Sequence, residues 1–290
     1  MSQLFAYLIA FLLPLASMAV PPPPGRASSA PFISGDTFRA FADYVYDELD
    51  ITLDPKTVQP SSVIFVKTDL LGDFFTHIHP HIPVRYILLS HNSDHLAPGP
   101  YAPFLNDPKL IAWFAQNYDG TNHAKMHPIP IGIANFHWPH GNFQAIQRVA
   151  AKRLAKTHLA YMNIAIQTFH EERWRVFKHF ATEAYCYRTP KKEYERFLYD
   201  VASSKFTIAP RGNGLDTHRL WEALYLGSIP IVQTSSLDSL YRELPVLIVP
   251  NWDDVTEEML EMCYASIAYA VESIEKLTMD YWARRINSCR

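Results

Sequence analysis

The sequence predicts an α/β protein with parallel sheets and enough length for two modest domains. Two short apolar runs, at 63–66 and 86–89, are typical of strands that are buried on both faces of a parallel sheet. Residues 206–232 follow the order strand, glycine-containing loop, helix and strand, which brings a helix N-terminus to the edge of such a sheet. The chain has 290 residues, of which 48% are hydrophobic and 19% charged, a composition typical of packed globular domains.

The unit at 206–232 contains its own start and stop signals. A strand at 206–209 is followed by Gly212 and Gly214, which permit a tight connection. Asp216 is the predicted N-cap of a helix of about three turns. Its apolar residues recur at helical spacing until Gly227, which provides a left-handed stop. A helix N-terminus in this position attracts phosphate groups.

Besides Asp216, four side chains in this unit carry or can carry charge: Arg211 on the loop, His218 and Arg219 in the first helical turn, and Glu222 one turn later. Arg219 and Glu222 are three residues apart and share a helix face, so a surface ion pair is one interpretation. In the other, Arg211 and Arg219 donate to a diphosphate and Glu222 accepts from ribose hydroxyls. Spacing leaves both open, because the glycines match neither the dinucleotide fingerprint nor a Walker A loop.

The whole string from 204 to 230, SKFTIAPRGNGLDTHRLWEALYLGSIP, resembles the nucleotide-sugar signature of exostosin-type glycosyltransferases. The resemblance implies the GT-B architecture, two Rossmann-like domains facing across a cleft, with the donor held mainly by the C-terminal domain. It also implies transfer of a sugar from a nucleoside-diphosphate sugar, UDP- or GDP-linked, to a glycan or related acceptor. The donor-binding residues that we expect are Arg173, Arg211, Gly212, Asn213, Gly214, Asp216, His218, Arg219 and Glu222.

The N-terminal half offers candidates for a catalytic base. Ligands of open α/β sheets gather beyond the carboxyl ends of strands, so segments 67–69 and 90–95 are expected to face the cleft. Within the second segment, Asp94 and His95 resemble an Asp-His element of exostosin-type enzymes. An inverting transfer needs a base near the acceptor hydroxyl, and Asp94, His95 or His91 can take a proton near neutral pH. A solvated turn is the alternative interpretation.

A predicted strand at 129–133 leads into a turn at 135–141 that is rich in aromatic and histidine residues. Aromatic rings in this turn are suited to stacking on a sugar face. We favour a Trp138 that is buried between the domains over one that stacks on sugar. His137 is a further candidate for the site.

The histidines at 77, 79 and 81 alternate as metal ligands on a strand would, but Pro80 interrupts a strand there. No cysteine or acidic residue stands nearby at ligand spacing, and the chain has no Asp-x-Asp triplet. We therefore expect no metal cofactor, with arginines and a helix dipole in the place of a cation.

Further elements follow from periodicity and caps. A helix over 36–49 is capped by Ser34 or Asp36. A loop at 170–173 carries Arg173 as a phosphate contact, with a surface charge on a helix as the alternative. The remaining expectations are a connecting helix over 142–156, strands at 159–166 and 246–249, and helices over 256–277 and 279–286, the last crossing back to the first domain.

The N-terminus predicts a secretory route. Residues 1–20 resemble a signal peptide or N-terminal anchor, although a positively charged start is absent, and 21–30 form a Pro/Ser-rich linker. Residues 31–141 are the predicted acceptor-side domain, and 142–290 the nucleotide-sugar-binding domain with terminal helices. We expect a protein of the secretory pathway or cell envelope, secreted or anchored to a membrane, rather than a cytoplasmic one.

Charge and cysteine content narrow the partners. A formal net charge of −3 argues against nucleic acid as the main partner. The three cysteines allow at most one disulfide. Two alternatives stay open: a non-catalytic carbohydrate- or nucleotide-binding protein on this scaffold, and a GT-B enzyme of another family, such as a fucosyltransferase-like one.

Overall fold

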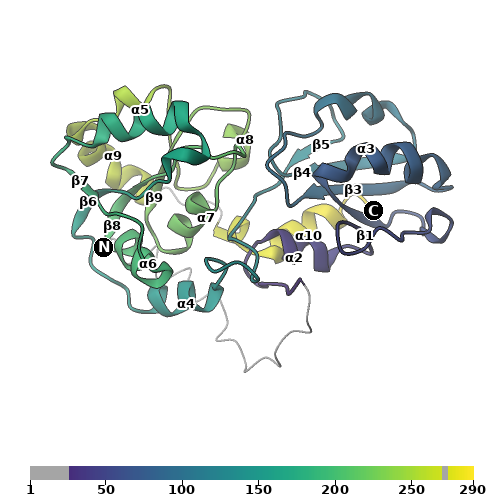
Figure 1. The fold of residues 1–290 in the computed structure, drawn as a ribbon, viewed down its shortest axis with the longest axis horizontal. Coiled ribbons are helices and arrows are strands. Elements are labelled where there is room, and N and C mark those ends of the chain that lie inside the picture. Colours follow the sequence, from purple (N-terminus) through teal and green to yellow (C-terminus); the bar gives the residue numbers. More distant parts are fainter. Residues whose placement is uncertain (1–25, 270–273) are drawn as a thin grey trace.

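A computed structural model describes residues 26–269 and 274–290 of the chain. The predicted signal peptide or anchor at 1–20 lies outside these residues, as does the linker before Arg26. Within the described ranges, no helix combines the length and the apolar character that a membrane crossing requires. The fold is built on two parallel sheets of five strands each, which lie side by side (Figure 1).

The first sheet has the order β1-β2-β3-β4-β5, with every neighbouring pair parallel. The predicted strands at 63–66 and 86–89 are confirmed as the buried central strands β2 and β3. The five strands are β1 (Tyr44–Tyr46), β2 (Val63–Lys67), β3 (Tyr86–His91), β4 (Leu110–Ala115) and β5 (Met126–Pro128). The short helix α3 (Leu71–Asp73) follows β2.

Two predictions for this half are wrong. Helix α2 (Gly35–Phe41) is capped by the Ser34 hydroxyl, which accepts from the Thr37 N–H at 3.1 Å, but it ends at Phe41 instead of residue 49. The next residues pair with β2 as edge strand β1, because aromatic and β-branched residues there suit a sheet. Residues 129–133 form no strand, since Pro130 has no N–H to donate and the Ile131 N–H donates to Asp216 at 2.8 Å.

The second sheet has the order β10-β9-β8-β6-β7 and is also parallel throughout. The strands are β6 (His158–Met162), β7 (Cys186–Arg188), β8 (Ser204–Ile208), β9 (Ile229–Gln233) and β10 (Leu247–Val249). Four of them lie in predicted segments, and β7 is too short to show a pattern in the sequence. The chain therefore has the predicted α/β fold class, with two Rossmann-like domains built on parallel sheets.

Helices surround the second sheet. They are α4 (Phe143–Ala151), α5 (His170–Phe180), α6 (Tyr194–Ala202), α7 (His218–Tyr225), α8 (Asp238–Tyr241) and α9 (Glu257–Tyr269). The predicted helix after the glycine loop is α7, but Thr217 and not Asp216 occupies its N-cap position. Its end matches the prediction: Gly227 has φ +66, and the Ser228 N–H donates to the Ala223 carbonyl at 2.9 Å.

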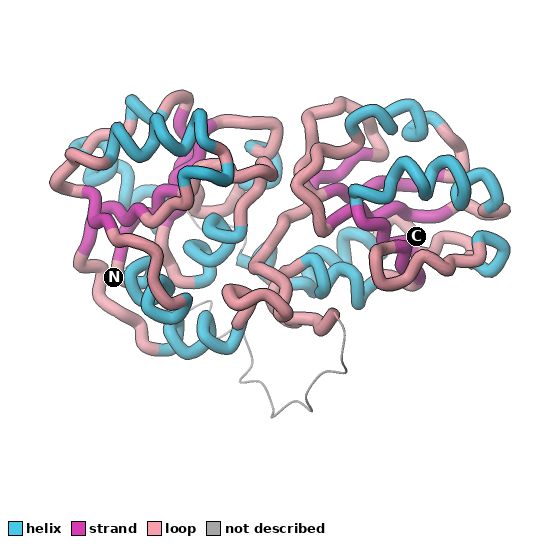
Figure 2. The backbone as a smooth tube through the Cα atoms, viewed as in Figure 1, coloured by secondary structure: helices cyan, strands magenta, loops and turns pink. Residues whose placement is uncertain are grey.

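The last helix, α10 (Met279–Asn287), returns to the first domain and lies beside α2 (Figure 1). The Met279 N–H donates to the Pro31 carbonyl at 3.0 Å, and Arg290 pairs with Asp43 at 2.6 Å. One apolar cluster continues from the first domain into the second and includes Ile87, Trp221 and Trp282. This shared core holds the two sheets in a defined relation, and loops occupy the facing sides of both (Figure 2).

Candidate active site

A cleft of about 1750 Å³ separates the two domains. Its first wall comes from segments that follow β2 and β3, including Lys67, Asp69 and residues 91–94. Its second wall comes from segments that follow β6, β7 and β8, together with α7. This is the position in which open parallel sheets bind ligands, at the carboxyl ends of their strands.

The glycine loop after β8 brings the two walls into contact. Gly212 and Gly214 line the cleft, and Asn213 between them is exposed. A Cβ atom on Gly214 would lie 2.8 Å from Asn117 Nδ2 and 3.1 Å from Asp94 Oδ1. Only glycine allows the first domain to approach this closely. The predicted donor loop and the predicted base Asp94 therefore meet across the cleft.

Arg173 supports this loop through hydrogen bonds and itself lines the cleft. It lies on helix α5, not on the loop predicted there, and it is buried. Its Nε donates to the Arg211 carbonyl at 2.7 Å, Nη2 to the Pro210 carbonyl at 3.2 Å, and Nη1 to the Ala165 carbonyl at 3.0 Å. Burial and then the positive charge of Arg219 lower the pKa of Arg173 to about 10. Arg173 fixes two segments of the second wall and leaves a positive charge beside them.

The two arginines of the motif take different places. The Arg211 guanidinium lies over the Phe169 ring, 4.3 Å from its centroid, and donates to the Asn213 carbonyl at 3.2 Å, outside the cleft lining that the described residues form. In this conformation Arg211 therefore lies away from the cleft lining. Arg219 does line the cleft, and its buried Nε has no hydrogen-bond partner among the described residues. Burial lowers the pKa of Arg219, which the negative charge of Glu222 opposes.

Glu222 is turned into the protein, with only 4% of the residue exposed, so the interpretation as a surface ion pair is wrong. The Tyr194 hydroxyl, at the start of α6, donates to Glu222 Oε1 at 2.9 Å. Burial raises the pKa of Glu222 to about 7, against the opposing effects of Arg219 and of this hydrogen bond. Sequence reasoning missed Tyr194, because nothing near it in the chain resembles the motif.

Asp216 and His218 have structural partners. Asp216 is buried, and its carboxylate accepts from Ile131 N–H at 2.8 Å, Trp221 Nε1 at 2.9 Å and Tyr241 hydroxyl at 3.1 Å. It therefore joins the domains and also lines the cleft, and the predicted helix cap is wrong because Thr217 holds the N-cap position. Burial raises the pKa of Asp216 to about 6.

His218 begins α7 and lines the cleft. Its Nδ1–H donates to the Gly132 carbonyl at 2.8 Å, which ties this helix to the first domain. Burial lowers the pKa of His218 to about 4. The imidazole is therefore neutral at pH 7 and adds no positive charge to the second wall.

The three predicted bases differ in their surroundings. His91 is buried, and both ring nitrogens are engaged: Nε2 donates to the Pro130 carbonyl at 3.0 Å and Nδ1 accepts from the Asn92 N–H at 2.7 Å. His95 is exposed and lies 3.7 Å from Asp69, outside the cleft lining of the described residues. Asp94 is exposed and opens on the cleft. Of the three, Asp94 has the position that a base requires.

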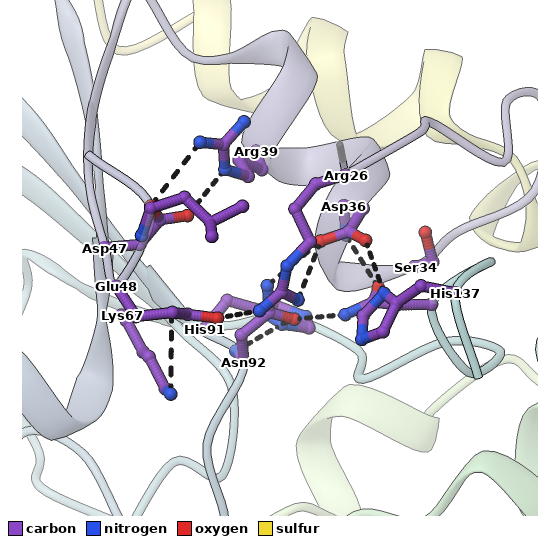
Figure 3. Close-up of polar contacts among 12 residues, drawn as sticks. Arg26, Ser34, Asp36, Arg39, Asp47, Glu48, Lys67, His91, Asn92 and His137 are labelled. Carbon is purple, nitrogen blue, oxygen red and sulfur yellow. Dashed lines mark hydrogen bonds and ion pairs between the residues drawn. The ribbon is translucent and has the colours of Figure 1, made fainter. Parts of the chain in front are cut away.

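A polar cluster at the start of α2 was missed by the sequence analysis (Figure 3). Asp36, at its centre, is fully buried. Its Oδ1 accepts from Arg26 Nη1 and from Asn92 Nδ2, each at 3.3 Å, and its Oδ2 lies 3.4 Å from His137 Nδ1. Burial raises the pKa of Asp36, against the opposing charge of Arg26. Ser34 caps the helix, so Asp36 is not needed as a cap. A second acidic residue beside a complete cap is the sequence signal that could have pointed to another role for Asp36.

The cluster is closed by close packing and by further ion pairs. A Cβ atom on Gly35 would lie 1.7 Å from Asn92 Oδ1, so the chain requires glycine at this point. Arg26 also pairs with Glu48, which lies 3.5 Å from Lys67. Arg26, Glu48 and Lys67 line the first wall of the cleft.

The turn at 135–141 lies on the cleft, with Trp138 53% exposed. The predicted burial of Trp138 between the domains is therefore wrong. Ring centroids are 5.1 Å apart for His137 and Trp138, 6.3 Å for Trp138 and His140, and 6.2 Å for His140 and His218. These four rings form a row from the Asp36 cluster to the first residue of α7.

Metal ligation has no assembled site in the part of the chain that the structure describes: no group of three His, Cys, Asp or Glu side chains is arranged for it. His79 is buried and bonded to the Tyr86 hydroxyl at 2.9 Å and to Asp107 at 3.1 Å, while His77 pairs with Asp73 at 2.9 Å. Cys186, Cys263 and Cys289 are free thiols in the structure.

Comparison with solved structures finds chains of low identity. The pneumococcal O-GlcNAc transferase GtfA, crystallised with UDP and GlcNAc, is 12% identical, with a TM-score of 0.40 over 80% of this chain and 57% of that one. A UDP-forming α,α-trehalose-phosphate synthase from Burkholderia vietnamiensis is 10% identical, with a TM-score of 0.37 over 80% of this chain and 68% of that one. No family model and no curated protein matches the sequence.

Proposed function

We propose that the protein is a metal-independent glycosyltransferase of the exostosin type, which moves a sugar from a UDP- or GDP-linked donor to a glycan or glycoconjugate acceptor. One observation carries the proposal. Arg219, with an unpartnered buried Nε in the described chain, and Glu222, buried beside it, both line the interdomain cleft next to the glycine loop. A buried cation and a buried carboxylate on one helix face suit a ligand that carries phosphate and hydroxyl groups.

The diphosphate is assigned to the start of α7. Among the described residues, no side chain caps this helix, so the N–H groups of its first turn can bind an anion. Arg219 stands in that turn, and Arg173 adds charge beside the loop. Together they offset the charge that develops on a departing diphosphate, the part that a metal ion takes in other transferases.

The ribose is assigned to Glu222, one turn further along the same helix. A carboxylate accepts from two neighbouring hydroxyls, and the Tyr194 hydroxyl holds Glu222 Oε1 in place. Exposed Trp138 and the first-domain wall face this donor position and are the proposed surface for the acceptor. The secretory route, and a membrane association through residues 1–20, are proposals from the N-terminal sequence.

Calorimetry with UDP and GDP, in the presence of a chelator, tests the donor site. We expect saturable binding of one of the two by the full-length protein and weaker binding by Glu222→Gln. Folded wild-type protein that binds neither nucleotide would contradict the proposal.

Turnover then separates the enzyme from a binding protein. Wild-type protein is incubated with UDP- and GDP-sugars and a set of oligosaccharide acceptors, and nucleotide release and elongated acceptor are measured together. Elongation supports the proposal. Tight nucleotide binding with neither transfer nor donor hydrolysis would favour the non-catalytic alternative, and use of GDP-fucose alone would favour the fucosyltransferase-like one.

A further inference from the structure

The geometry points to His137 as the group that takes the proton from the acceptor hydroxyl, with Asp36 as the residue that positions it. This inference deepens the proposed function and depends on it. It concerns the first wall of the cleft, where none of the residues of the recognised motif lies.

The first observation is an unsatisfied buried oxygen. Asp36 is fully buried, and within the described chain its Oδ2 has no hydrogen-bond partner. His137 Nδ1 lies 3.4 Å from this oxygen (Figure 3). Hydrogen bonds between catalytic groups are often long without substrate and shorten in the complex. A buried carboxylate beside an imidazole favours the tautomer with hydrogen on Nδ1 and stabilises the ring when it becomes positively charged.

The second observation is that Asp36 is held rigidly. Its other oxygen accepts from Arg26 and Asn92, and its backbone N–H donates to Asn135 Oδ1 at 2.8 Å. Asn135 Nδ2 in turn donates to Asn92 Oδ1 at 2.9 Å. Asn135 begins the turn that carries His137, so one network sets both members of the pair. Such support for an orienting carboxylate is what precise proton transfer requires.

The third observation is the direction of the ring. With Nδ1 toward the buried carboxylate, Nε2 lies on the opposite side of the ring, and the His137 side chain is 36% exposed and lines the cleft. Trp138 next to it offers an indole face for a sugar. The row of rings ends at His218, in the helical turn where the diphosphate is assigned. His137 therefore opens on the same cleft as the proposed donor site, next to the proposed acceptor surface at Trp138.

The step balances without a further reactant. The acceptor oxygen forms a bond to the anomeric carbon while its proton moves to His137 Nε2. The bond from that carbon to the diphosphate oxygen breaks, and its electron pair leaves with the nucleoside diphosphate. The imidazolium, paired with Asp36, then releases its proton to water. A single displacement of this kind inverts the anomeric centre.

The test compares His137→Ala with His77→Ala in full-length protein. His77 also pairs with an aspartate, Asp73 at 2.9 Å, but its side chain is 67% exposed and outside the cleft lining of the described residues. We expect His137→Ala to lower kcat by about 10²- to 10⁴-fold, with UDP or GDP affinity unchanged, and His77→Ala to retain wild-type kcat. Added imidazole is expected to restore part of the lost turnover.

A pH profile separates positioning by Asp36 from a merely structural role. The charged and titratable groups around Asp36 are Arg26, Arg39, which is engaged with Asp47 at 2.5 Å, and His137 and buried His91. Asp36→Asn removes the negative charge beside the imidazole, so the acidic limb of kcat/KM is expected to move to lower pH and kcat to fall. In His137→Gln, the pH profile of kcat/KM should lose its acidic limb.

Three results would overturn the inference: wild-type kcat in folded His137→Ala, a product that retains the anomeric configuration, or loss of turnover in Asp94→Asn while His137→Ala stays active. The last would return the role to Asp94. Absence of any donor turnover by wild-type protein would instead overturn the proposed function, and this inference with it.

Discussion

The two walls of the cleft differ in how their charges are paired. On the first wall, Arg26 pairs with Asp36 and Glu48, and Lys67 lies 3.5 Å from Glu48. On the second wall, Arg173 donates to backbone carbonyls, and the Nε of Arg219 has no hydrogen-bond partner in the described residues. Arg26 and Lys67 on the first wall are paired directly with carboxylates. On the second wall, by contrast, Arg173 is held by carbonyl oxygens, and Arg219 is opposed by the charge of Glu222 without a hydrogen bond to its Nε in the described residues.

This difference in charge pairing indicates which wall is suited to a charged ligand. A buried charge is costly unless a partner compensates it, so the second wall is suited to an anionic group such as a diphosphate. The first wall is already compensated and suits a neutral, hydroxyl-rich molecule, with Asp36 and His137 available for a proton. The same contrast distinguishes Arg173, which holds the loop, from Arg219, which has capacity for a ligand.

The largest expected effect comes from removing the Asp216 hydrogen bonds that connect the two domains. In Asp216→Asn, one carboxylate oxygen becomes an amide that cannot accept from Ile131 or Trp221. We expect a loss of about 2–3 kcal/mol in the free energy of unfolding, because buried groups lose their partners. Urea denaturation measures it, with exposed Asp280→Asn as the control, expected within about 0.5 kcal/mol of wild type. Equal stability of the two variants would show that the Asp216 hydrogen bonds do not hold the two domains together.

The next effect separates the two arginines of the motif. Arg219→Met should weaken nucleotide binding by about 1.5–3 kcal/mol, roughly 10- to 150-fold, because a charged hydrogen bond to phosphate is lost. Arg211→Met should change it little, since Arg211 lies over Phe169. Calorimetry on both variants checks the contrast. If Arg211→Met lost affinity and Arg219→Met did not, the assignment within the second wall would be reversed.

A pH effect is expected from Glu222. Its folded pKa, about 7, lies above the ordinary value near 4.5, so between these values the folded protein binds more protons than the unfolded chain. The contribution of Glu222 to stability is therefore present below pH 4.5 and declines as the pH rises to about 7. Unfolding free energies of wild type minus Glu222→Gln, measured from pH 4.5 to 8, should fall across this window and then level off. A difference that is flat with pH would contradict a buried Glu222.

The smallest effect concerns the acceptor surface. Trp138→Ala removes an exposed indole face and should raise the acceptor KM by the equivalent of about 0.5–1.5 kcal/mol, with donor affinity and fold unchanged. Trp174→Ala, which removes a 42% exposed indole on α5, is the matched control. Steady-state kinetics with varied acceptor measures both. An increase of equal size in the two variants would remove Trp138 from the acceptor site.

Several parts of this structure are predictable from local sequence. The central strands β2, β3, β8 and β9 are compact apolar runs, and α7, between β8 and β9, has helical spacing and a glycine stop. The failures share a cause. Both segments have suitable local residues. The helix expected to reach residue 49 ends early because the following residues pair with β2, and the strand expected at 129–133 is absent because the Ile131 N–H bonds to Asp216.

The sequence by itself determined the fold class, the place of the glycine loop and helix α7, and Glu222 and Arg219 as their polar residues, because periodicity and turn chemistry act over a few neighbouring residues. Only the tertiary structure decided that Arg211 lies over Phe169, that Asp216 joins the domains, and that Asp36 lies beside His137. Asp36 and His137 are about a hundred residues apart in the sequence, and no local pattern predicts a contact over that distance. Packing of α2 against the turn at 135–141, within the first domain, brings them together.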